Sequence, residues 1–154
     1  MRHPLALTLL TLAAQVAAVD RFDDAYSADI FIGGASWHPG HQGAFNDVNP
    51  GLGIGFSSLP REHGFATVGV QSMLMTYRDS FSQQAYVAGA GPKLLMGPEN
   101  GLHGEATLLV AYLKGSGTNG FTVLPYVGVG YKQVTLEAVY APKTDGNNEP
   151  AGYP

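Results

Sequence analysis

The chain has 154 residues, a net charge of −4 and only 13% charged residues, about half of the roughly 25% found in average soluble domains. This length suggests one domain, and the acidic balance, without any cluster of Lys or Arg, argues against binding to nucleic acid. Cysteine is absent, which excludes disulfides, thiolate metal sites and a cysteine nucleophile.

The N-terminus shows the features of a secretory signal in their usual order. Met1–Pro4 is a short basic start, and Leu5–Ala14 is an apolar run that is too short to span a bilayer, which takes ~20 residues. Val16, Ala17 and Ala18 are small residues of the kind that a signal peptidase reads. We therefore expect residues 1–18 to be a signal peptide, cut after Ala18, and residues 19–154 to form a single domain. A buried core helix is the alternative for this segment.

The rest of the chain consists of short segments with strand character, separated by polar turns with Gly or Pro, such as Gly115–Gly120. Most segments have the ~9–11 residues that a tilted membrane-spanning strand needs. Within Leu102–Leu113 an apolar row alternates with a mixed row, as a membrane barrel requires. The sequence therefore predicts an all-β fold, a small antiparallel up-and-down outer-membrane β-barrel. Seven strands are expected in chain order: Ala28–Trp37, Gly51–Leu59, Phe65–Tyr77, Ala85–Met96, Leu102–Leu113, Thr122–Tyr131 and Val134–Tyr140.

Three candidate catalytic residues lie at strand ends. His38 follows the first expected strand, and Asp79 and Ser80 follow the third. Strands of an up-and-down barrel alternate in direction, so these two ends should share one rim. His could act as a base, Ser as a nucleophile or hydrogen-bond donor, and Asp as the group that orients the His. The alternative is a rim His beside a solvated Asp-Ser loop.

The other histidines do not complete a metal site. His41 lies three residues after His38, but no further ligand has suitable spacing, and His63 and His103 flank expected turns. We therefore expect neither a metal nor a cofactor.

Glycines alternate along several expected strands, among them Gly89 and Gly91. A strand face without side chains either leaves interior space for a straight acyl chain or relieves crowding in a tightly packed barrel. The residues alone leave both explanations open.

Several segments, in order and with similar spacing over about residues 28–142, resemble the lipid A palmitoyltransferases (the PagP type). Ala35–His38 looks like the Trp-His end of that family's first strand, and Met75–Phe81 like its signature of a basic residue, Asp-Ser and an aromatic. Further segments resemble the family's aromatic-Asn-acidic loop, its Gly-rich second strand and its later strands: Phe45–Asp47, Asn49–Phe56, Ala88–Gly91, Leu124–Tyr131 and Val134–Pro142.

The resemblance implies an eight-stranded, monomeric outer-membrane enzyme that moves a palmitoyl chain from a glycerophospholipid to lipid A. Its catalytic residues would be His38, Asp79 and Ser80. Its acyl pocket would lie inside the barrel along Gly89 and Gly91, with the depth set at Gly91. Two further functions remain open, a lipid hydrolase (phospholipase or lipid A deacylase) and a non-enzymatic lipid-binding or structural barrel.

The chain departs from the family pattern at both ends. The residues between Ala18 and the first expected strand are too few for the family's N-terminal amphipathic helix. Asp145–Pro154 contains two prolines and few apolar residues, so it does not match the aromatic-rich strand that closes the family's barrel. We therefore expect about seven identifiable strands. The chain is then truncated, closes its barrel differently, or no longer works as a membrane enzyme.

Overall fold

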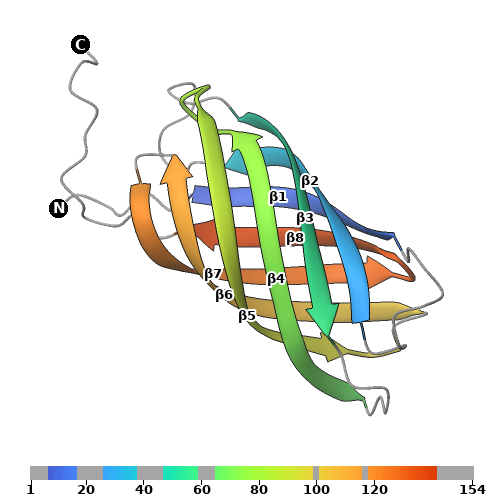
Figure 1. The fold of residues 1–154 in the computed structure, drawn as a ribbon. Helices are drawn as coiled ribbons and strands as arrows, with labels where there is room; N and C mark the ends of the chain where they lie inside the picture. The colour runs from blue at the N-terminus through green and yellow to red at the C-terminus, as the bar shows by residue number, and fades with distance from the viewer. Residues whose placement is uncertain are drawn as a thin grey trace, which may run out of the picture.

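The protein is an all-β, up-and-down antiparallel barrel (Figure 1). The computed structural model describes residues 7–16, 26–37, 47–58, 65–98, 101–115 and 118–141. In this part of the chain no helix is long and apolar enough to cross a membrane. The strands are β1 (Leu7–Val16), β2 (Tyr26–Trp37), β3 (Val48–Ser58), β4 (Ala66–Arg78), β5 (Gln84–Met96), β6 (Leu102–Gly115), β7 (Thr118–Tyr131) and β8 (Val134–Ala141).

All seven expected strands are confirmed, as β2 to β8. One expected turn is shorter than predicted, because β6 and β7 extend into the segment Gly115–Gly120. Leu113 pairs with Gly120, and the ladder continues to the pair Gly115 and Thr118. Backbone pairing across the sheet therefore outweighs the turn preference of the glycines there.

An eighth strand, β1, closes the barrel by pairing with both edges of the curled sheet formed by β2 to β8. Leu12, for example, pairs with Ile32 of β2 and Leu136 of β8. This corrects the expectation of about seven strands. The strand lies within the predicted signal peptide, however, and cleavage after Ala18 would remove it and leave the edges of β2 and β8 unpaired. A cleaved signal and this closing strand therefore exclude each other in one mature chain.

The barrel has two ends, an upper rim and a lower rim. The upper rim is the end formed by the last residues of β2, β4, β6 and β8, and the lower rim is the opposite end. The last residues at the upper rim are Trp37, Arg78, Gly115 and Ala141.

Side chains alternate between the outer and the inner face along each strand, and apolar side chains lie on both faces. The buried polar side chains lie mainly in two layers inside the barrel. The lower layer contains Asp29, Ser57, Gln71, Lys93, His103, Glu105, Thr107, Thr135 and Glu137. The middle of the barrel holds an apolar core of Phe31, Met73, Met75, Tyr77, Ala85, Val87, Leu109, Ala111, Leu113, Leu124, Tyr126 and Val139. At the upper rim the buried polar residues are Ser36, Asn49, Asp79 and Ser80.

Candidate functional site at the upper rim

A β-bulge near the end of β2 decides which side chains face the upper interior. The pairing of β2 with both neighbouring strands shifts register between Gly33 and Ala35. Two consecutive residues, Gly34 and Ala35, are exposed, and Ser36 is buried. Bulges re-aim side chains in this way, and Gly accommodates them readily. The bulge therefore turns Ser36, two residues before His38, into the barrel.

Ser36 contacts the turn that follows β4. Its hydroxyl oxygen lies 3.3 Å from that of Ser80, and the two oxygens share a hydrogen bond. Ser36 is 6% exposed and Ser80 is 4% exposed. Because β3 lies between β2 and β4 in the barrel, this contact spans the inside of the rim. It ties the end of β2 to the turn that carries the predicted Asp-Ser pair.

Asp79 organises this turn through its side chain and its backbone. Its Oδ1 accepts hydrogen bonds from the backbone N–H groups of Phe81, at 3.0 Å, and Gln83, at 2.8 Å. Its own N–H donates to the carbonyl oxygen of Gln83 at 2.8 Å. Asp79 is 1% exposed, so these bonds offset part of the cost of burying its carboxyl group. Asp79 therefore has a structural role in the turn, whatever its chemical role.

Of the three predicted catalytic residues, Asp79 and Ser80 are buried neighbours in one turn at the upper rim. His38 lies outside the described residues. It directly follows Trp37, the last residue of β2, and the ends of β2 and β4 do share one rim, as the topology predicts. Ser36 was missed as a site residue, because simple alternation through Phe31 and Gly33 assigns it to the outer face. The only local signal for the bulge is the pair Gly33-Gly34.

The interior directly below this polar group is apolar. Down the inner face of β4 from Asp79, the next inward residues are Tyr77, Met75 and Met73, and all three are buried. The six residues from Asp79 to Met73 correspond to about 20 Å along the strand. Below Met73 the next inward residue is Gln71, whose Oε1 accepts a hydrogen bond from Thr107 at 2.9 Å. The apolar core therefore ends at the level of Gln71.

The two predicted pocket residues lie on the inner face of β5 at this boundary. Gly89 pairs with Met73 and Gly91 pairs with Gln71, so Gly91 marks the level where the interior changes from apolar to polar. Packing also accounts for both glycines. A Cβ atom at Gly91 would collide with the carbonyl oxygen of Leu108, and one at Gly89 would lie 2.6 Å from the Cβ of Ala111. Their role in an acyl pocket stays a prediction.

The lower layer contains a charged cluster that was not predicted. Lys93 Nζ lies 3.1 Å from Glu105 Oε2, and both side chains are almost fully buried. His103, which flanks the turn before β6, is the second residue of that strand, as expected. Its Nε2 lies 3.3 Å from both Glu105 Oε1 and Thr135 Oγ1. The sequence signal that could have revealed this cluster is the presence of charged residues at strand positions that alternate inward.

Within the described ranges, no three or more His, Asp and Glu side chains are grouped so that they could hold a metal ion. Comparison with protein-family models and with curated proteins gave no match.

Proposed function

We propose that the protein spans the Gram-negative outer membrane and transfers a fatty acyl chain, preferentially palmitoyl, from a glycerophospholipid to a hydroxyl group of lipid A. The observation that carries this proposal is the contact between Ser36 and Ser80. It brings Ser36, two residues before His38, to the turn that holds the buried Asp79 and Ser80, so two segments that resemble the family's motifs meet at one rim.

The outer surface supports a membrane location. Exposed aliphatic residues cover the middle of the barrel, among them Leu52, Ile54, Leu74, Leu108, Val110, Val127 and Leu136. Exposed aromatic residues lie toward the two rims: Tyr86, Tyr112, Phe121 and Tyr140 toward the upper one, and Tyr26, Phe56, Phe65 and Tyr131 toward the lower one. An apolar belt between two aromatic girdles is typical of outer-membrane barrels.

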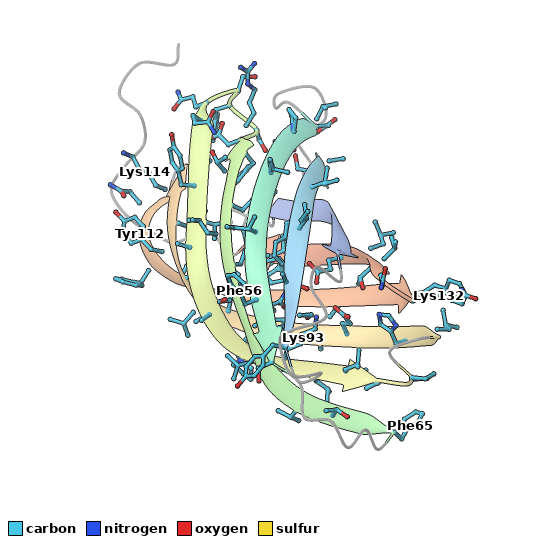
Figure 2. The ribbon with its side chains drawn as sticks, turned by 45° about the vertical axis from the view of Figure 1, so that its right-hand side comes forward. Phe56, Phe65, Lys93, Tyr112, Lys114 and Lys132 are labelled. Atoms are coloured by element: carbon cyan, nitrogen blue, oxygen red, sulfur yellow. The ribbon has the colours of Figure 1, made fainter. Side chains whose placement is uncertain are left out.

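Lysine side chains accompany the exposed aromatic residues near both ends of the barrel. Figure 2 shows Tyr112 and Lys114 near one end of the barrel, and Phe65 and Lys132 at the other. Lys132 Nζ lies 5.4 Å from the centre of the Tyr131 ring. Aromatic rings with lysines beside them suit the boundary between acyl chains and headgroups, where the ammonium group can reach water or phosphate.

The reaction itself is an ester exchange. His38 would take the proton of the lipid A hydroxyl, whose oxygen then bonds to the carbonyl carbon of the donor ester. The bond from that carbon to the glycerol oxygen breaks, and the proton passes to this leaving oxygen. Ser80 would stabilise the intermediate oxyanion or act first as a nucleophile. The apolar interior around Met73 and Met75 would receive the acyl chain and exclude water, because methionine side chains are flexible enough to move aside.

The test is the acylation of lipid A by His38→Ala, Asp79→Ala and Ser80→Ala variants, followed by mass spectrometry of lipid A and of released fatty acid. Each substitution should lower the rate of transfer by ~10²–10⁴-fold, the usual contribution of a general acid or base. Gln83→Ala is the matched control, because this exposed side chain belongs to the same turn. Parent-like acylation by all three variants would refute the assignment, and free fatty acid as the main parental product would indicate a hydrolase instead.

One observation favours a second candidate, a lipid-binding barrel without enzymatic activity. Asp79 is already used as a cap for its turn, which a purely structural residue would explain. Asp79→Asn separates the two, because the amide oxygen can still accept both backbone hydrogen bonds while the negative charge is lost. An enzyme should lose most activity in Asp79→Asn at unchanged thermal stability. If Asp79 has only a structural role, Asp79→Ala should lose thermal stability, Asp79→Asn should keep it, and the parent should form no acyl product.

A further inference from the structure

Ser36 and Ser80 form a pair of buried hydroxyl groups in the upper interior. Their oxygens lie 3.3 Å apart, and they come from the end of β2 and from the turn after β4. The β-bulge at Gly33–Ala35 is what turns Ser36 inward. The apolar core with Tyr77 and Met75 begins directly below them.

We propose that the hydroxyl groups of Ser36 and Ser80 together form the oxyanion site of the reaction, which makes Ser36 a catalytic residue. This inference rests on the proposed acyl chemistry at the upper rim and extends it to a residue outside the predicted His-Asp-Ser set. The ligand is the negatively charged oxygen of the tetrahedral intermediate that forms when a lipid ester is attacked.

The distance between the two oxygens suits this task. Two donors 3.3 Å apart can both reach one acceptor oxygen at the ~2.7–3.1 Å that oxyanion donors require. Each hydroxyl rotates about its C–O bond, so both protons can turn from their present partners toward a new negative charge. Burial strengthens the effect, because few water molecules compete with the donors for that charge.

The position of the pair also fits the path of an acyl donor. A chain lying in the apolar interior along Met73 and Met75 places its carboxyl end near the top of β4, where Ser80 follows Asp79. The carbonyl oxygen would then lie between the two serines, while the attacking oxygen approaches from the rim.

The experiment compares Ser36→Ala, Ser36→Thr and Ser57→Ala in purified full-length protein, with a phospholipid donor and lipid A in mixed micelles. Ser36→Ala should lower kcat by ~10²–10³-fold, as loss of one oxyanion donor does, with little change in KM. Ser36→Thr keeps the hydroxyl and should retain most activity. Ser57 is also a buried strand serine, and its hydroxyl donates a hydrogen bond to Asp29 at 2.6 Å in the lower layer, so Ser57→Ala should lose stability but keep kcat.

A binding measurement gives a second readout that does not depend on turnover. A hexadecylphosphonate monoester carries a tetrahedral, negatively charged phosphorus centre that resembles the intermediate. The carbonyl carbon of the matching hexadecanoate ester is planar, and the ester is uncharged. Titration into the parent and Ser36→Ala should show at least tenfold weaker phosphonate binding in the variant, with unchanged binding of the ester.

The outcomes separate this inference from the proposed function. If the parent releases only free fatty acid, transfer to lipid A is refuted, and the effect of Ser36→Ala on hydrolysis still decides the role of the pair. If the parent shows no turnover, the phosphonate titration decides it. Equal kcat in Ser36→Ala and the parent, or equal phosphonate affinity in the two proteins, would overturn the inference.

Discussion

Gly91 offers the sharpest test of how β5 and β6 pack. An added Cβ atom there would collide with the carbonyl oxygen of Leu108, and would also lie 2.9 Å from that carbonyl carbon and 3.2 Å from the Cα of Leu109. All three neighbours are backbone atoms, so no side-chain rotation relieves the contact. Gly91→Ala must therefore push the two strands apart.

The expected cost follows from this geometry. Overpacking, with the side-chain and backbone shifts that it forces, typically costs about 1–3 kcal/mol and occasionally more. Because all three close contacts at Gly91 are with backbone atoms, Gly91→Ala should lie at or above the upper end of that range. Gly104 in β6 is the matched control, since a Cβ there would meet nothing closer than Met96 Cε at 3.6 Å. Gly104→Ala should be neutral or stabilise by about 0.4–1 kcal/mol, because it lowers the entropy of the unfolded chain.

The two variants should thus differ by about 3 kcal/mol or more, which is over a hundredfold in the unfolding equilibrium. Urea unfolding in detergent micelles can measure this difference, with the fluorescence of Trp37, the single tryptophan, as the signal. Equal midpoints for the two alanine variants would show that β5 and β6 are not packed as described. A stable Gly91→Ala that also shortens the transferred acyl chain would instead favour a purely pocket-lining role for Gly91.

Two further predictions concern other parts of the barrel. Lys93→Met should destabilise the fold by about 3–5 kcal/mol, because it leaves the buried Glu105 carboxylate without the Lys93 ammonium group. In the same urea assay, the double variant Lys93→Met with Glu105→Gln should regain part of this loss. If the losses of the two single variants simply add in the double variant, the pairing is contradicted. Intact-mass measurement of protein extracted from outer membranes tests whether β1 belongs to the mature barrel. Removal of residues 1–18, which the predicted signal peptide requires, would mean that the mature barrel closes without β1, whereas a mass that includes Met1 would refute the signal peptide and favour Leu7–Val16 as the closing strand.

The sequence by itself determined the strands and the rim of the site. Alternating apolar residues and Gly-rich turns depend only on neighbours along the chain, so β2 to β8 could be located to within a few residues. Asp79 and Ser80 could be assigned to a strand end for the same reason, and the up-and-down order then placed this end on the rim where β2 also ends.

Tertiary structure alone decided which side chains meet inside the barrel. Ser36 faces inward only because β2 shifts register against both of its neighbours, and a register shift is a property of paired strands rather than of one segment. The ion pair of Lys93 and Glu105, like the collision that excludes a side chain at Gly91, depends on the approach of β5 and β6. Such approaches are set by the closure of the whole barrel, which no local pattern of residues encodes.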